Sequence, residues 1–182
     1  MNLPPPDSSR YAELIARLDA FDVRVQAAQR TYLRCASGCD GCCRLRRTAF
    51  PVEVAAIRHA LTTLPPERVE ALRARRDAAD VKAGARCVFL EGDGRCAVYA
   101  ARPVVCRTHG PAIRTSEGLS WCKLNFDGLG PGVVEAGIPA SAVMNLDLVN
   151  QMLVLIDAEY RSGLSESASL PIRLDLAEAL SP

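Results

Sequence analysis

The apolar residues of this chain recur mainly at intervals of three and four positions, which is the spacing of amphipathic helices. Proline and glycine residues interrupt the pattern and mark where each predicted helix begins or ends. The predicted helices cover about residues 9–33, 51–64, 67–81, 103–110, 141–163 and 171–180. Residues 127–139 contain four glycines and two prolines, and we expect them to form a loop or linker.

One stretch departs from the helical spacing. Two short apolar runs flank Glu91-Gly92-Asp93-Gly94, a sequence that is typical of tight turns. This pattern predicts a small β-hairpin whose arms carry Cys87 and Cys96. The two sulfurs would then lie close together without help from the rest of the fold.

The chain has 182 residues, of which 49% are hydrophobic and 5% are aromatic. This length suits one domain, or one domain with an extension. We predict a mainly α fold, a small irregular helical domain with a short β-hairpin, organised around a Cys-ligated metal centre. Its predicted parts are a cysteine-bearing domain over residues 1–126, with an N-terminal helix, and a helical extension over residues 127–182 that packs on the same domain.

Eight cysteines carry the candidate chemistry. Four of them lie within nine residues, at Cys35, Cys39, Cys42 and Cys43, and the others are Cys87, Cys96, Cys106 and Cys122. Gly38 and Gly41 permit tight turns within the first run, and such turns aim several sulfurs at one point. We therefore expect one or two thiolate-bound metal centres, with all eight cysteines as candidate ligands.

Two further features concern individual residues. Neighbouring side chains diverge in a regular backbone, so Cys42 and Cys43 are expected to serve different centres, or one of them to be a buried or reactive thiol. His109 lies three residues after Cys106 and is a candidate additional ligand, proton carrier or hydrogen-bonding support. The alternative for His109 is a surface position beside a helix end.

Whether the cysteines are interpreted as metal ligands or as disulfides depends on the cellular compartment of the protein. The N-terminus lacks the basic start and apolar run of a secretory signal, and no stretch approaches the roughly 20 uninterrupted apolar residues of a membrane helix. We therefore expect a cytoplasmic protein that does not contact a membrane. In a reducing cytosol, metal ligands or redox groups are favoured over the alternative of four disulfides.

The net charge of +1 conceals an uneven distribution. The first 126 residues carry 20 basic and 13 acidic side chains, whereas residues 127–182 carry 2 and 8. A basic half can attract nucleic acid or an acidic protein partner. We favour another explanation, in which acidic C-terminal helices pack on or face the basic half and arginines offset thiolate charge.

The combined motif resembles a known family. It comprises Cys35-x3-Cys39-x2-Cys42-Cys43, Cys87-x-Phe89-Leu90, Gly94-x-Cys96-x-Val98-Tyr99 and Arg102-Pro103-x-x-Cys106-Arg107. Over about residues 30–125 the chain is similar to the bacterial and archaeal cysteine-cluster family whose usual label is a zinc- or iron-chelating domain. Flagellin lysine methylases are distant relatives by the same cysteine pattern. The resemblance implies that all eight cysteines belong to the pattern, and it does not extend to the histidine.

Two kinds of metal centre fit eight cysteines. Closed tetrahedral zinc sites take four nitrogen or sulfur ligands each, so eight cysteines would satisfy two of them. Iron–sulfur clusters also take four cysteines, often from close runs. The crowded run favours an iron–sulfur cluster slightly over zinc, and both stay open.

Three functions stay open as well. The favoured one is a metal-binding protein whose centre is structural, redox-active or used in metal handling. The second is a small enzyme of the radical S-adenosylmethionine or methylase type, since Cys35-x3-Cys39-x2-Cys42 has the cluster spacing of radical enzymes, although 182 residues leave no room for their α/β barrel. The third is a metal-stabilised adaptor or nucleic-acid-binding protein, for which the few aromatic residues offer little base stacking.

Overall fold

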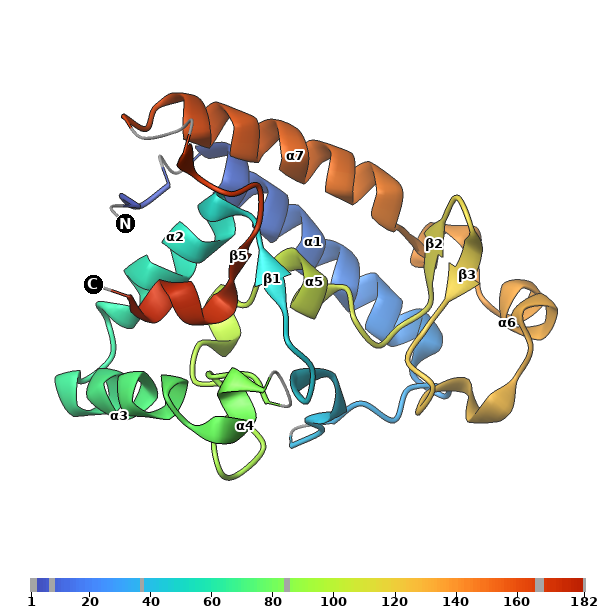
Figure 1. Cartoon of the computed structure of the whole chain (residues 1–182). Helices are drawn as coiled ribbons and strands as arrows, with labels where there is room; N and C mark the ends of the chain where they lie inside the picture. The colour runs from blue at the N-terminus through green and yellow to red at the C-terminus, as the bar shows by residue number, and fades with distance from the viewer. Residues whose placement is uncertain (1–2, 7–8, 37, 84–85, 166–168, 182) are drawn as a thin grey trace. The chain divides into compact units, whose positions relative to one another are not determined.

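The computed structural model describes residues 3–6, 9–36, 38–83, 86–165 and 169–181 (Figure 1). The fold is mainly α with a few short strands, as the sequence predicts. Among these residues, no helix combines the length and the apolar character needed to cross a membrane. The chain forms two compact units: unit 1 comprises Met1–Ser8, Ser37–Pro103 and Ile156–Pro182, and unit 2 comprises Ser9–Ala36 and Val104–Leu155. The division at residue 126 expected from the sequence stays a prediction.

Unit 1 contains two longer helices, short helical turns and a two-stranded antiparallel sheet. Its elements are η1 (Gly41–Cys43), β1 (Thr48–Ala49), α2 (Pro51–Leu61), α3 (Pro66–Arg76), α4 (Ala79–Lys82), η2 (Tyr99–Ala101), β5 (Leu174–Asp175) and η6 (Leu176–Leu180). Strand β1 pairs with β5, and Ala49 lies opposite Leu174. A segment near the C-terminus therefore lies beside the segment that follows the cysteine run.

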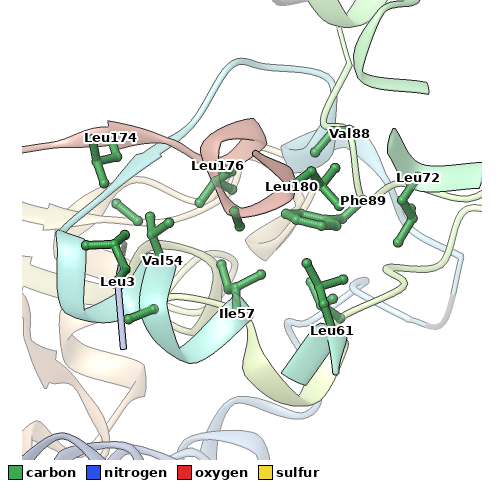
Figure 2. Packing of buried hydrophobic residues seen from close by; sticks show 14 of the residues in the cluster. Leu3, Val54, Ile57, Leu61, Leu72, Val88, Phe89, Leu174, Leu176 and Leu180 are labelled. Atoms are coloured by element: carbon green, nitrogen blue, oxygen red, sulfur yellow. The ribbon is translucent and has the colours of Figure 1, made fainter. Parts of the chain in front are cut away.

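The core of unit 1 joins α2, the C-terminal segment and the chain that follows Cys87 (Figure 2). Val54 and Ile57 of α2 are fully buried, and η6 packs against both α2 and α3. Val88 and Phe89 are 2% and 1% exposed and belong to the same cluster. The segment that carries Cys87 is therefore anchored by its apolar neighbours.

Unit 2 contains α1 and a small mixed sheet. Its elements are α1 (Ser9–Gln29), α5 (Val104–Arg107), β2 (Ile113–Thr115), β3 (Gly118–Ser120), η3 (Phe126–Gly128), α6 (Pro131–Gly137), η4 (Ala140–Ala142), β4 (Met144–Asn145) and, up to residue 155, α7 (Leu146–Ser162). Strand β2 lies in the middle, antiparallel to β3 and parallel to β4. Figure 1 shows β2 and β3 as a hairpin.

Two predictions of local structure need correction. Residues 127–139 were expected to be a loop, but they contain η3 and α6. Pro131 provides the start of α6, and the buried side chains of Val134 and Ile138 pack in one cluster with Phe126. Tyr32, about 100 residues earlier, packs against the same cluster, and such a contact has no local signature in the glycine-rich sequence.

The C-terminal segment also differs from its prediction. A helix was expected over residues 171–180, but Leu174–Asp175 forms β5 and only Leu176–Leu180 is helical, as a 3-10 turn. The Asp175 carboxylate accepts a hydrogen bond from the Ala177 N–H and caps this turn. Pairing with β1 fixes the residues before the cap in an extended conformation.

A buried amide joins three segments of unit 2. Gln29, the last residue of α1, is 0% exposed. Its Nε2 donates to the carbonyl of Ala142 at 2.9 Å, and its Oε1 accepts from the Ala112 N–H at 2.8 Å. A buried backbone group without a hydrogen-bond partner costs free energy, so the Gln29 side chain stabilises the fold by pairing with both groups.

We predict that Gln29→Leu lowers the free energy of unfolding by about 2 kcal/mol or more, because it leaves the Ala112 N–H and the Ala142 carbonyl unpaired. Gln26→Leu is the matched control, since Gln26 is exposed and its amide donates to the Asp22 carboxylate on the same helix. The control should change stability by less than about 0.5 kcal/mol. Equal effects of the two substitutions in urea denaturation would contradict this role of Gln29.

In unit 1, a buried carboxylate likewise pairs with a backbone group of another segment. Asp157 is 3% exposed, and its Oδ1 accepts a hydrogen bond of 3.0 Å from the Val52 N–H in the first turn of α2. Burial raises the pKa of the Asp157 carboxyl, although the Val52 N–H and the charges of Arg161 and Arg173 oppose this shift. The folded protein therefore holds the proton of this group more tightly than the unfolded chain does.

The raised pKa has a direction that stability measurements can test. The contribution of Asp157 to stability is greatest below its unfolded pKa, near 3.9, and declines as pH rises through the folded pKa. Asp157→Asn keeps the acceptor for the Val52 N–H and removes the ionisation, so it should become more stable relative to wild type as pH rises from 4 to 7. Asp157→Ala should be destabilised by about 1–3 kcal/mol at every pH, because the Val52 N–H loses its partner. Parallel pH profiles for wild type and Asp157→Asn would contradict the assignment.

Candidate metal centre

The first cysteine run of unit 1 is a tight turn. The Cys43 N–H donates to the Asp40 carbonyl at 2.8 Å, which closes η1. Gly38 precedes it with a φ of +89°, a backbone conformation that L side chains rarely adopt. Cys39 is exposed, whereas Cys42 and Cys43 are half-buried.

The sulfurs of Cys42 and Cys43 lie 3.9 Å apart. The two side chains therefore point to one place, contrary to the divergence expected from a regular backbone; the irregular 3-10 turn is the reason. A hydrogen bond with Cys43 is the main cause that lowers the pKa of Cys42 to about 6, against the opposing effect of burial. The charge of Arg47 contributes, and its guanidinium also donates to the Cys42 carbonyl at 3.4 Å.

The second cysteine-bearing segment of unit 1 is a hairpin-like loop. Leu90 and Cys96 form an isolated antiparallel bridge, and the Ala97 N–H donates to the Phe89 carbonyl at 2.8 Å. The sequence predicts a hairpin with Cys87 and Cys96 on its arms, but the structure has an isolated bridge here, with Cys96 in the bridge and Cys87 before it. The Cys87 N–H donates to the Cys43 carbonyl at 2.7 Å, so the two cysteine-bearing loops are joined by a backbone hydrogen bond.

The thiols of the hairpin loop differ from Cys42. Burial raises the pKa of Cys87, and it raises that of Cys96 to about 11. Negative charge on Cys42 raises the pKa of Cys87 further, and charge on Cys87 does the same for Cys96. These three thiols are therefore close enough to influence one another, and a bound cation would relieve both burial and repulsion.

Arginine side chains fix the hairpin loop. Arg75 donates to the Leu90 carbonyl at 3.0 Å, and Arg86 donates to the carbonyls of Leu90 and Glu91 at 3.1 Å each. Arg68 forms an ion pair with the Glu91 carboxylate at 2.7 Å. The arginine excess of this region thus satisfies carbonyls and carboxylates around the cysteines.

Two glycines bring the loops of unit 1 into contact. Gly94 has a φ of +80°, and a Cβ atom built on it would lie 2.8 Å from the Gly38 carbonyl oxygen. Backbone atoms approach here more closely than any side chain would permit. The close approach holds the two cysteine-bearing loops together.

We predict that Gly94→Ala lowers both metal content and melting temperature, because the added methyl group would force the loops apart. Gly92→Ala is the control in the same turn, since its Cβ would meet no atom within 4 Å. Metal analysis and thermal unfolding of both variants provide the measurement. Full metal content in Gly94→Ala would show that the contact does not matter to the centre.

The other three cysteines belong to unit 2. Cys35 is exposed, Cys106 and Cys122 are half-buried, and His109 is exposed. The Cys35 sulfur lies 3.2 Å from the position of a Cβ on Gly110, and the Cys122 N–H donates to the Gly110 carbonyl at 3.1 Å. The segments that carry Cys35 and Cys122 therefore meet at Gly110.

The sequence did not indicate one residue of this region. Asn125 is 1% exposed, and its Nδ2 lies 3.4 Å from the Cys35 sulfur. A single asparagine three residues after Cys122 carries no signal in the sequence, because it contacts Cys35 only after the chain has folded.

The donor chemistry fits zinc or iron, since soft thiolates suit both metals. All eight cysteines are described, and none is in a disulfide. As their side chains lie, no three Cys, His, Asp or Glu residues of the described chain converge closely enough to hold a metal ion. Binding would therefore require thiol side chains to rotate.

The cysteine-bearing segment resembles a known protein family in sequence. Residues 34–123 match the model of the family CxxCxxCC, described as "Putative zinc- or iron-chelating domain". This segment has the features of a zinc- or iron-chelating domain. The match covers just under half of the chain and includes all eight cysteines. No curated protein and no solved structure matches the chain. The link to flagellin lysine methylases, the origin in bacteria or archaea and the cytoplasmic location stay predictions.

Proposed function

We propose that unit 1 binds a zinc ion of its own through the thiolates of Cys42, Cys43, Cys87 and Cys96, and that the ion has a structural role. The observation that carries the proposal is the 3.9 Å separation of the Cys42 and Cys43 sulfurs. A tetrahedral ion with Zn–S bonds of about 2.3 Å separates two of its sulfur ligands by about 3.8 Å. The adjacent pair therefore suits two corners of one tetrahedral site.

The same distance bears on the choice of metal. In a [4Fe–4S] cluster each of the four cysteines binds a different iron atom, so its ligands are spread around a larger centre. The crowding of cysteines in the sequence favours an iron–sulfur cluster slightly. The close pair moves our proposal to a mononuclear site, for which zinc is the common occupant of four thiolates.

The hairpin loop would supply the other two ligands of the tetrahedral site, Cys87 and Cys96. Cys87 is tied by its own N–H to the Cys43 carbonyl, and the pKa values of Cys87 and Cys96 respond to neighbouring thiolate charge. Rotation of these side chains towards the pair would complete the site without moving the backbone bond. The remaining candidate ligands outside this set of four are Cys35, Cys39, Cys106, Cys122 and His109.

A structural role follows from where the four ligands lie. Two come from the η1 turn and two from the hairpin loop, so one ion would cross-link both segments. The core of unit 1 is extensive, and the ion is therefore needed for the loops rather than for the helices. Tight metal binding to the folded protein raises its stability.

We predict that Cys87→Ser and Cys42→Ser each lose the zinc ion of unit 1 and lower the melting temperature. Val98→Ala is the control for destabilisation alone, because Val98 is 5% exposed in the same core but carries no ligand. It should cost on the order of 2 kcal/mol while keeping the metal. Treatment with a chelator should lower the melting temperature of wild type and Val98→Ala but not that of Cys87→Ser.

Several outcomes would contradict the proposal. One is a brown protein that contains iron and acid-labile sulfide after anaerobic purification. Another is normal metal content in either cysteine variant. Cleavage of S-adenosylmethionine by the reduced protein would instead support the enzyme of the radical type.

A further inference from the structure

We infer that Asn125 is a positioning residue for Cys35, and that its amide N–H holds the Cys35 sulfur in place as a metal ligand of unit 2. This inference rests on the proposed metal-binding function. Asn125 lies two residues beyond the part of the chain that matches the family. It is 1% exposed, which is rare for an asparagine unless its polar groups have partners.

The orientation of the Asn125 amide is fixed by two bonds to the backbone. Its Oδ1 accepts the Arg34 N–H at 2.8 Å, and its Nδ2 donates to the Gly110 carbonyl at 2.7 Å. An N–H can only donate and a carbonyl can only accept, so the reversed amide would face like groups on both sides. The side chain therefore presents its remaining Nδ2 hydrogen in one direction.

That remaining hydrogen is directed at Cys35. The Cys35 sulfur lies 3.4 Å from Nδ2 and 3.7 Å from Oδ1. A protonated thiol could donate to the oxygen, but a thiolate can only accept, and the nearer nitrogen is the donor that it would use. Metal binding requires the thiolate, and the Asn125 Nδ2 group offers that thiolate a hydrogen-bond donor.

Contacts of the neighbouring residue Phe126 fix the backbone at Asn125. The next residue, Phe126, has a φ of +66°, which is a genuine outlier for a bulky residue. Phe126 is 1% exposed and stacks on Tyr32 with ring centroids 5.3 Å apart, and its N–H donates to the Tyr32 carbonyl at 2.9 Å. These contacts fasten the segment of Asn125 to the segment that leads into Cys35.

The other side of the Cys35 sulfur is bounded by Gly110. This glycine has a φ of +121°, and a Cβ there would lie 3.2 Å from the sulfur. Its carbonyl accepts from both Asn125 Nδ2 and the Cys122 N–H. Asn125 and Gly110 thus lie on two sides of the sulfur, next to the segment of Cys122. Groups that orient metal ligands in this way are typically worth 10- to 100-fold in metal affinity.

The test is a double-mutant cycle on metal affinity. Asn125→Asp keeps an oxygen for the Arg34 N–H and removes the donor to sulfur. Zinc-loaded full-length proteins are titrated with a competing chelator, and Cys35→Ser identifies the release step that depends on Cys35. Asn125→Asp should weaken that step about tenfold. In the Cys35→Ser background it should change the remaining affinity by less than about twofold, because its effect acts through the sulfur.

Two glycine variants provide an independent measurement. Gly110→Ala places a methyl group against the Cys35 sulfur, whereas Gly118→Ala, at a φ of +115°, meets no atom within 4 Å. Both substitutions strain the backbone, but only Gly110→Ala should weaken the step that depends on Cys35. Cobalt-substituted Asn125→Asp and Gly110→Ala should also lose sulfur-to-metal charge-transfer absorbance per bound ion.

The outcomes separate the two proposals. A wild-type protein that binds no metal would overturn the proposed function and this inference with it. A wild type that binds metal and loses it in Cys87→Ser, but whose Asn125→Asp variant has unchanged affinity, would overturn the inference alone. Equal losses from Asn125→Asp with and without Cys35 would also overturn it, because the effect would then be general destabilisation.

Discussion

The hydrogen bond from the Cys87 N–H to the Cys43 carbonyl is the constraint on which the proposed centre of unit 1 depends. It joins two loops that are far apart in the sequence and have little regular structure of their own. Apolar neighbours hold one end of this link, since Val88 and Phe89 are buried in the core directly after Cys87. The backbones of the proposed ligands Cys43 and Cys87 are thus brought together by apolar packing and a backbone hydrogen bond.

Several arginines of unit 1 stabilise the loops that carry its cysteines. The surplus of basic residues before residue 126 could be taken as a surface for nucleic acid. Within unit 1, however, Arg68, Arg75 and Arg86 bind a carboxylate or backbone carbonyls around the hairpin loop. Arg44 pairs with Asp40 beside the first cysteine run. A guanidinium can satisfy several acceptors at once, which explains the choice of arginine over lysine where loops lack regular hydrogen bonding.

The sequence was most informative where the pattern is local. The spacing of apolar residues predicts α1, α2 and α7 within a few residues, and Pro51 marks the start of α2. The turn between Cys87 and Cys96 was also predictable from its Asp and Gly residues. The strand β5 and helix α6 were not, because each depends on residues distant in sequence: Leu174 pairs with Ala49, and Val134 belongs to a cluster against which Tyr32 packs.

The same distinction applies to the candidate sites. Cysteines can be recognised as candidate ligands by residue type and spacing alone. The closeness of the Cys42 and Cys43 sulfurs could not be predicted, because it arises from the irregular η1 turn. The role inferred for Asn125 is also invisible in sequence, since the amide reaches Cys35 across 90 residues. Candidate ligands can be recognised from residue type in the sequence, whereas residues that support a ligand can be recognised only from contacts in the folded structure.

X-ray absorption spectroscopy of the metal bound to the purified protein tests the central claim most directly. The account predicts stoichiometric zinc, a first shell of sulfur at about 2.3 Å, and no second metal nearby. A sulfur shell accompanied by a short metal–metal distance, as in an iron–sulfur cluster, would contradict it. A first shell made mainly of oxygen would contradict it as well, because the cysteines would then not be the ligands.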